Sequence, residues 1–265
     1  MILYMGLGRM GLPMANHARR AGQDVIGFDP SAERRAMFAA GGGAAVPDFD
    51  THLLQADAVV IMVGSQSQVE AIVAGEGGVM QRCAPGTLVL VVSTVAPQFI
   101  ADLGQRVAAK GIRLVDAPVC RAEMGAVQGS LLTFLSGSEA DCREAAELMR
   151  PYSADVEVVG TRLGAAQVAK TVNNMILWAC AVANEEGLKL AASWQLDTEA
   201  LRRALVTSSA DNWCLRNWDR IGEMPWSIKD MDIALETAGE NAITVPLGEA
   251  VSRLVRISSV LSHAA

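Results

Sequence analysis

Short apolar runs alternate with amphipathic stretches along the first 160 residues of the chain. Apolar runs bounded by turn residues are typical of buried strands, and the stretches between them have helical spacing. We expect strands at 2–7, 24–29, 56–63, 87–93, 112–118, 131–137 and 156–160. We expect helices at 10–21, 31–40, 66–74, 97–109 and 139–149. This alternation predicts an α/β domain whose mostly parallel sheet is covered by helices on both faces.

After Gly160 the pattern becomes helical throughout. The segment from Ala165 to Ala192 is rich in alanine and contains no proline, which predicts one long helix joining two domains. Its uncharged part, Thr171 to Asn184, is shorter than the roughly 18 residues of a membrane span. Further helices are expected at 197–206, 212–222, 227–239 and 246–261. The sequence therefore predicts an α/β domain over 1–160 and an all-helical domain over 161–265.

Composition narrows the possible partners. Half of the residues are hydrophobic, so the chain has enough apolar side chains for a substantial core. The formal charge of −7 argues against binding to nucleic acid or to an acidic membrane surface. The cysteines and histidines are scattered and contain no Cys-x-x-Cys pair, so we expect no metal site, no disulfide framework and a cytoplasmic location. They are Cys83, Cys120, Cys142, Cys180, Cys214, His17, His52 and His263.

The first apolar run leads into the turn Gly6-Leu7-Gly8-Arg9-Met10-Gly11, which has the pattern G-x-G-x-x-G. A strand is expected before this turn and a helix after it, which is the context in which the pattern binds a dinucleotide. Free backbone N–H groups and the positive end of the helix dipole would hold the pyrophosphate. A glycine-rich turn without a ligand remains the alternative.

Asp29 ends the second expected strand, 18 residues beyond Gly11. A carboxylate there can accept hydrogen bonds from the ribose hydroxyls of the adenosine and would repel a 2′-phosphate, which favours NAD over NADP. Two alternatives remain: Asp29 could cap a helix beside Pro30, and Arg34 or Arg35 could reach a 2′-phosphate.

Several further motifs occur in the order found in the β-hydroxyacid dehydrogenases, the family of 3-hydroxyisobutyrate dehydrogenase, which is more distantly similar to 6-phosphogluconate dehydrogenase. This resemblance implies an N-terminal Rossmann domain, a long interdomain helix, a helical C-terminal domain that forms homodimers or homotetramers, and a catalytic lysine at position 170. The motifs are GLGRMGLPMA, VSTVAP (92–97), DAPV (116–119), GAVQGSLLTFLSG (125–137), GAAQVAKTVNN (164–174) and KDMDIALETA (229–238).

Lys170 is also conspicuous in the sequence itself, because it is the only charged residue between Arg162 and Glu185. The chemistry needs a group that takes the hydroxyl proton while a hydride leaves the same carbon, and lysine can do this. Asn174 lies one helical turn further on the same face and could help to hold the substrate. The alternatives are a surface lysine extending to water and an amide that satisfies buried backbone groups.

The resemblance assigns weaker roles to other residues. Thr94, with Ser93, would lie near the nicotinamide ribose, Val63 would lie along the cofactor, and Lys229 would lie near it. A hydroxyl capping the next helix and ordinary core packing are the alternatives for the first two sites. Ser209 and Asn212 fall where the family places residues near the substrate.

One segment departs from the family pattern. Where the family normally reads Ser-Gly-Gly after DAPV, this chain has Cys120, Arg121 and Ala122. A guanidinium suits a carboxylate, phosphonate or sulfonate, and the sulfolactaldehyde reductases are similar in placing an arginine shortly after this strand. Arg121 could instead point to solvent or pair with Glu123. The segment 223–227 is also shorter than in the family, so pocket residues there cannot be transferred.

The sequence as a whole predicts an NAD-dependent oxidoreductase that interconverts a short β-hydroxyacid, or an analogue with another anionic headgroup, and its aldehyde or ketone. The cofactor carries the redox chemistry and the protein orients it. Two alternatives remain at this stage: an imine reductase, in which another residue usually stands at position 170, and a non-catalytic NAD-binding regulator.

Overall fold

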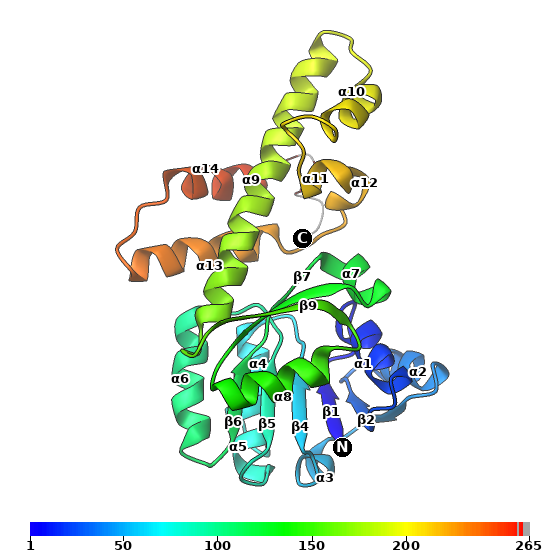
Figure 1. Cartoon of the computed structure of the whole chain (residues 1–265), viewed down its shortest axis with the longest axis vertical. Helices are drawn as coiled ribbons and strands as arrows, with labels where there is room; N and C mark the ends of the chain where they lie inside the picture. The colour runs from blue at the N-terminus through cyan, green and yellow to red at the C-terminus, as the bar shows by residue number, and fades with distance from the viewer. Residues whose placement is uncertain (259, 262–265) are drawn as a thin grey trace. The chain divides into compact units, whose positions relative to one another are not determined.

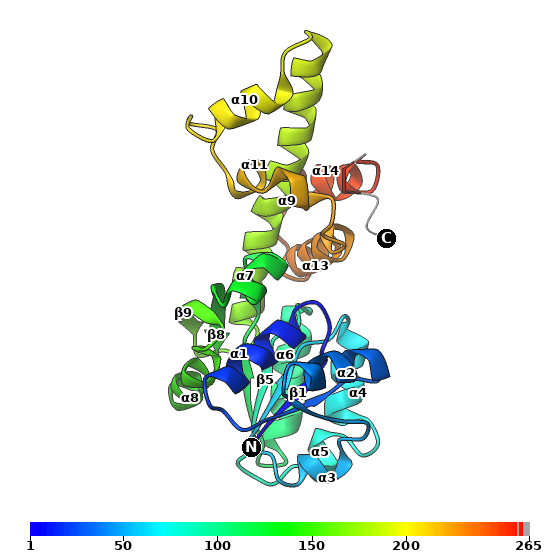
Figure 2. The ribbon, with the colours of Figure 1, turned by 90° about the vertical axis from the view of Figure 1, so that its right-hand side faces the viewer.

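The computed structural model describes residues 1–258 and 260–261 (Figure 1). His263 and part of the helix expected at 246–261 lie outside the described residues. The chain divides into two compact units, Met1–Lys170 and Thr171–Ala265, which can be followed in two views (Figures 1 and 2). One long helix continues across this division.

The N-terminal unit is built on one sheet of nine strands within the described residues. The strand order is β3-β2-β1-β4-β5-β6-β8-β7, and β9 pairs with β8. The strands β1 to β6 run parallel, whereas β8 runs antiparallel to both β6 and β7. The bounds are β1 Ile2–Met5, β2 Val25–Phe28, β3 Ala44–Val46, β4 Ala58–Ile61, β5 Leu88–Val91, β6 Arg113–Asp116, β7 Val119–Cys120, β8 Leu131–Ser136 and β9 Ser153–Gly160.

Helices cover both faces of this sheet. Buried side chains of α1, α2 and α8 pack on one face, and those of α3, α4, α5 and α6 pack on the other. The mostly parallel α/β architecture predicted from the alternating pattern is therefore confirmed. The bounds are α1 Gly11–Arg20, α2 Ala32–Ala40, α3 Asp50–Leu53, α4 Gln66–Ala74, α5 Val79–Arg82, α6 Pro97–Ala108, α7 Ala122–Gln128 and α8 Glu139–Met149.

The second unit is helical, as predicted. Its first element is the part of α9 beyond Lys170, and the fully buried Trp178 of this helix donates its indole N–H to Asp230 Oδ2 of α13 at 3.1 Å. All five tryptophans of the chain follow residue 170, whereas both tyrosines precede it. The bounds are α9 Ala165–Ser193, α10 Thr198–Leu205, α11 Trp213–Arg216, α12 Trp218–Ile221, α13 Ser227–Glu240 and α14 Pro246–Val255.

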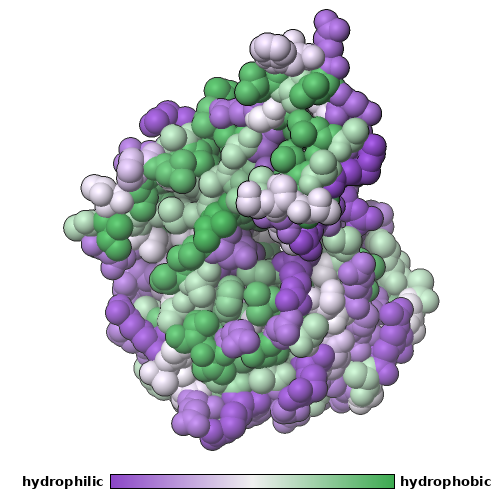
Figure 3. All heavy atoms as spheres, turned by 45° about the horizontal axis from the view of Figure 1, so that its top comes forward, coloured by the Kyte–Doolittle hydropathy of each residue, from purple (hydrophilic) through white to green (hydrophobic). Residues whose placement is uncertain are grey.

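Apolar side chains are also present at the surface, where they are drawn in green in Figure 3. Those on α9 include Val168, Val172 and Ile176, which follow one another at intervals of four residues and are all exposed. In the part of the chain that is described, no helix combines the length and the apolarity that a membrane crossing would need.

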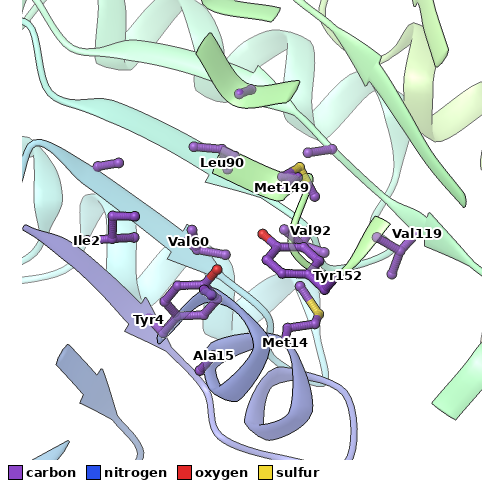
Figure 4. Packing of buried hydrophobic residues seen from close by; sticks show 14 of the residues in the cluster. Ile2, Tyr4, Met14, Ala15, Val60, Leu90, Val92, Val119, Met149 and Tyr152 are labelled. Carbon is purple, nitrogen blue, oxygen red and sulfur yellow. The ribbon is translucent and has the colours of Figure 1, made fainter. Parts of the chain in front are cut away.

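Two aromatic side chains mark the centre of the core on the α1 side of the sheet (Figure 4). The rings of Tyr4, on β1, and Tyr152, just before β9, meet edge to face with centroids 6.4 Å apart. Met14 of α1 and Met149 of α8 belong to the same buried cluster. Both rings are almost completely buried, so this contact ties the first strand to the segment that follows α8.

Five short elements of the N-terminal unit were not expected: β3, α3, α5, β7 and α7. Two expected helices are also shorter than predicted. The segment 212–222 is broken at Asn217, whose side-chain amide donates to Trp213 O at 2.9 Å. The last helix ends at Val255, and Ser258 Oγ accepts from the amides of Val260 and Leu261 instead of allowing the helix to continue.

Candidate active site

The glycine turn has the geometry that its spacing predicts. Gly6 has φ +102°, and a Cβ added there would lie 2.2 Å from Met62 O. A Cβ at Gly11 would lie 2.0 Å from Gly6 O, so the helix start packs directly on the turn. At Gly8, in contrast, a Cβ would meet nothing within 4 Å. At Gly6 and Gly11 a side chain would collide with backbone atoms of the protein, so packing alone requires glycine there. At Gly8 the space beside the backbone is open, which suits a bound pyrophosphate.

Asp29 lies directly after β2 and faces this turn. Its Oδ2 accepts from the Leu7 amide at 2.8 Å and its Oδ1 accepts from the Ser31 amide at 2.9 Å. The cap of α2 is the Ser31 hydroxyl, which accepts from the Arg34 amide. The half-buried carboxylate of Asp29 therefore belongs to the glycine turn, where a ribose could reach it.

Arg35, one of the two arginines considered for a 2′-phosphate, is held by the backbone. Its Nη1 donates to Asp29 O at 2.6 Å and to Pro30 O at 3.0 Å. Arg34 stays half-buried on the first turn of α2. Arg9, within the glycine turn, forms an ion pair with Glu123 of α7 at 2.5 Å.

The loops after β4 and β5 are joined by a side chain. The Val63 amide donates to Ser93 Oγ at 2.8 Å, and Ser93 is buried. Thr94, the next residue, is half-buried. The sheet order places β4 between β1 and β5, so these loops lie at the same edge of the sheet as the glycine turn, and the cofactor contacts of Val63 and Thr94 stay predictions.

Lys170 and Cys120 meet in the N-terminal unit. Lys170 Nζ lies 3.7 Å from Cys120 Sγ, at the end of β7. The lysine is half-buried and the thiol is buried. Two residues that the sequence singled out separately, 50 positions apart, are therefore brought into contact.

Arg121 and Ala122 follow Cys120 in an unusual conformation. Their φ angles are +82° and +52°, in the left-handed region that glycine adopts most readily. The Arg121 guanidinium donates to Asp155 Oδ2 of β9 at 2.5 Å and to Ser130 O at 2.8 Å. Its ionic partner is thus Asp155, while Glu123 is taken by Arg9.

A buried carboxylate at the end of β6 completes the N-terminal part of the site, and sequence reasoning missed it. Asp116 accepts from the Gln167 side chain at 2.8 Å, from the Gln167 amide at 3.0 Å and from Ser136 Oγ at 3.2 Å. Burial raises the pKa of the Asp116 carboxyl to about 7, against these donors, which lower it. A signal was present, because the DAPV and GAAQ motifs contain Asp116 and Gln167.

The remaining candidates lie in the helical unit. Asn174 is buried on α9 and accepts from Asn173 Nδ2 at 3.0 Å. Asn212 exchanges amide hydrogen bonds with Asn184 and caps α11 by accepting from the Leu215 amide. Ser209 lies in an exposed turn and Lys229 is half-buried on the first turn of α13.

Two family comparisons cover almost the whole chain. Residues 1–160 match the family described as the NAD binding domain of 6-phosphogluconate dehydrogenase. Residues 164–263 match the family described as NAD-binding of NADP-dependent 3-hydroxyisobutyrate dehydrogenase. The chain belongs to the β-hydroxyacid dehydrogenase family. As a β-hydroxyacid dehydrogenase of the 3-hydroxyisobutyrate dehydrogenase type, it is an NAD(P)-dependent oxidoreductase.

Individual β-hydroxyacid dehydrogenases differ in their named substrates. An NAD-dependent L-serine dehydrogenase of Pseudomonas aeruginosa is 31% identical over 97% of this chain and 91% of its own. A 3-hydroxyisobutyrate dehydrogenase of the same organism is 30% identical over 93% of this chain and 88% of its own. The solved structure of Mycobacterium tuberculosis 3-hydroxyisobutyrate dehydrogenase with L-serine has a TM-score of 0.86, 25% identity, and coverage of 99% of this chain and 94% of that one.

Proposed function

We propose that this β-hydroxyacid dehydrogenase interconverts a short β-hydroxyacid, or an analogue with another anionic headgroup such as a sulfonate, and its aldehyde or ketone. The observation that carries the proposal is the position of Lys170, whose Nζ lies against the end of β7 in the same unit as the glycine turn. The names of the relatives, which include serine and 3-hydroxyisobutyrate dehydrogenases, agree with a small hydroxylated acid.

A bound nicotinamide dinucleotide supplies the hydride acceptor, or the donor in the reverse direction. Lys170, as the neutral amine, takes the proton of the substrate hydroxyl as the hydride leaves the same carbon, and the ammonium returns it in reduction. Asn174 lies four residues further along α9, on the same side of the helix, and helps to hold the reacting oxygen. Ser209 and Asn212 stay predicted contacts of the substrate.

Arg121 and the backbone around Cys120 and Ala122 hold the acid headgroup in this proposal. The guanidinium is paired with Asp155 on an exposed part of the unit, so a substrate anion exchanges with this carboxylate. Exposed ion pairs of this kind contribute little free energy, so little is lost when the substrate anion replaces Asp155. A planar guanidinium can bind a carboxylate or a sulfonate through two parallel hydrogen bonds.

The preferred nucleotide is NAD, and NADP is the weaker alternative. The argument rests on the Asp29 carboxylate, which is fixed at the glycine turn by the amides of Leu7 and Ser31. A negative charge there accepts hydrogen bonds from ribose hydroxyls and repels a 2′-phosphate. Asp29→Ser should narrow the preference, measured as the ratio of kcat/KM for NAD⁺ to that for NADP⁺.

The proposal is tested with a panel of three- and four-carbon β-hydroxyacids and hydroxyalkyl sulfonates, oxidised by the purified protein with NAD⁺ and with NADP⁺. Lys170→Ala should lower kcat for the best substrate by about 10²- to 10⁴-fold, because general acid–base catalysis contributes on this scale. Lys110→Ala, at an exposed lysine of the same unit, is the matched control. Turnover that survives Lys170→Ala would refute the assignment.

The protein also forms homodimers or homotetramers in this proposal. The exposed Val168, Val172 and Ile176 form an apolar stripe along one side of α9, and such a stripe is best covered by a second copy. Sedimentation velocity of wild type and of Val172→Glu/Ile176→Glu tests this, and a wild type that stays monomeric at micromolar concentration contradicts it.

A further inference from the structure

The first turn of α9 is held by buried side chains of the sheet. The Ala166 amide donates to Ser136 Oγ at 3.0 Å, and the Gln167 amide donates to Asp116 Oδ2 at 3.0 Å. The first amides of a helix have no partner within it, so Ser136 and Asp116 replace the missing carbonyls. Gly164, which precedes the helix, has φ +92°, and a Cβ there would lie 2.5 Å from Pro97 O. The chain therefore enters α9 along a path that the sheet determines.

The Gln167 side chain connects this helix start to the loop after β5. Its Nε2 donates to Asp116 Oδ1 at 2.8 Å and to Ser93 O at 3.0 Å. Its Oε1 accepts from the Val95 amide at 3.1 Å. Gln167 and Asp116 are completely buried, and the Ser93 hydroxyl continues the network to the Val63 amide. Every bond in this network joins residues that are distant in sequence.

A buried polar network of this kind is a poor way to gain stability, because packed apolar side chains of the same volume would do as well. What it provides is one defined geometry. Gln167 and Lys170 are three residues apart and so lie on neighbouring positions of the helix surface. A rotation or shift of the first turn of α9 therefore moves Lys170 relative to Cys120 and the glycine turn.

We propose that Asp116 and Gln167 are positioning residues for Lys170, which act by fixing the first turn of α9 to the ends of β5 and β6. This inference rests on the proposed role of Lys170 as the proton-transfer group. Neither residue touches the reacting atoms, and both act through the helix that carries the lysine.

The central variant is Gln167→Met, which keeps the volume of the side chain and removes its amide. Ser136→Ala is the milder second variant, because it removes only the cap of Ala166 and one donor to Asp116. Thr87→Val is the matched control. It removes a buried hydroxyl that donates to Ala56 O at 3.1 Å at the other end of the sheet.

Two measurements are made on each purified variant. The first is steady-state kinetics, together with the NADH dissociation constant from calorimetry. The second is the rate of acetylation of Lys170 by limiting acetic anhydride as a function of pH, followed by mass spectrometry of the peptide that contains residue 170. The second measurement needs neither turnover nor a known substrate.

Gln167→Met should lower kcat by about 10- to 100-fold, because small misplacements of a catalytic group have effects of this size. It should also displace the pH profile of Lys170 acetylation, with the NADH dissociation constant within twofold of wild type. Ser136→Ala should change kcat and acetylation in the same direction by less, and Thr87→Val should change neither.

The inference is overturned if a folded Gln167→Met, or a folded Ser136→Ala should the first variant not fold, keeps both the wild-type kcat and the wild-type acetylation profile. This outcome leaves the proposed function intact, provided that Lys170→Ala is inactive. If Lys170→Ala stays active instead, the proposed function fails, and the acetylation profiles still report whether the network positions the lysine.

Discussion

The nucleotide end and the substrate end of the candidate site differ in which residues adopt left-handed backbone conformations. At the nucleotide end, the left-handed residue is Gly6, and the turn around it follows a glycine pattern. At the substrate end, Arg121 and Ala122 adopt left-handed conformations although neither is glycine. Such conformations cost a non-glycine residue roughly 1–2 kcal/mol each.

The comparison shows which end holds non-glycine residues in left-handed conformations. From the family resemblance we expected glycines at these two positions, and the φ angles of Arg121 and Ala122 are ones that glycine adopts readily. Tertiary contacts hold this strained conformation in place, among them the hydrogen bond from the Arg121 guanidinium to Ser130 O. The nucleotide end thus has glycine at its positive φ, whereas the substrate end has arginine and alanine at its two positive φ angles.

The largest effect should come from the glycine turn. Gly11→Ala places a Cβ 2.0 Å from Gly6 O, a backbone atom that cannot move away, so the free energy of unfolding should fall by more than about 4 kcal/mol. Gly8→Ala meets no protein atom within 4 Å and should leave the melting temperature unchanged.

Gly8→Ala should nevertheless weaken NADH binding by at least about tenfold in calorimetry, because its methyl group enters the space assigned to the pyrophosphate. Unchanged affinity in this variant would show that the nucleotide does not lie over the turn.

The next effect is a pH dependence of stability that arises at the buried carboxyl of Asp116. The pKa of Asp116 is about 7 in the folded protein, against 3.8 for an ordinary aspartate, because of burial. Below about pH 4 both the folded and the unfolded chain hold this proton. Between about pH 4 and pH 7 only the folded chain holds it, so this carboxyl makes the free energy of unfolding fall as the pH rises. Since one pKa unit corresponds to about 1.4 kcal/mol, the whole window amounts to at most about 4 kcal/mol.

Urea unfolding of wild type and Asp116→Asn at pH 5 and pH 7.5 measures this contribution. The wild type should lose more of its free energy of unfolding between these two pH values than the variant does. Equal losses in both proteins would mean that Asp116 titrates as it does in the unfolded chain.

The variant Arg121→Gln tests whether the guanidinium binds the anionic group of the substrate. Loss of a charged hydrogen-bonding group should raise KM for the anionic substrate by about 10- to 100-fold, equivalent to roughly 1.5–3 kcal/mol. Asp155→Asn should lower KM, since it removes the competitor for the guanidinium. If both variants have wild-type KM values, Arg121 serves only the ion pair with Asp155.

The smallest expected effect is the change in the free energy of unfolding caused by Ala122→Gly. Relief of the left-handed strain at the first residue of α7 should raise the free energy of unfolding by about 1 kcal/mol. Ala32→Gly, at the first residue of α2, is the matched control and should lower it by about 0.5–1 kcal/mol. A decrease for both variants would show that the conformation at Ala122 is not strained.

The sequence was sufficient for the parts of the fold that local chemistry determines. The strand–turn–helix around Gly6 and Gly11 and the 29-residue helix α9 were predicted to within a few residues. Both depend on periodicity and on residues that are adjacent in the chain. The break at Asn217 was missed because hydrophobic spacing does not reveal that the side-chain amide of Asn217 donates to Trp213 O beside its own backbone amide.

The sequence was sufficient to name individual residues of the candidate site, but it did not reveal which of them contact one another. Lys170 and Cys120 were both named from the sequence, yet their 3.7 Å approach depends on the pairing of β7 with β8. The partner of Arg121 is 34 residues away on β9, and no local pattern indicates it. Asp116 and Gln167 lie within recognised motifs, but only the fold brings the two motifs together.

The separation of tyrosines and tryptophans between the two units gives the molecule a built-in pair of reporters. Emission excited at 295 nm comes from tryptophan, and so only from residues beyond 170, whereas the buried Tyr4 and Tyr152 report on the sheet. Two spectral channels recorded in a single melt would therefore reveal whether the two halves of the chain lose their structure together or in sequence.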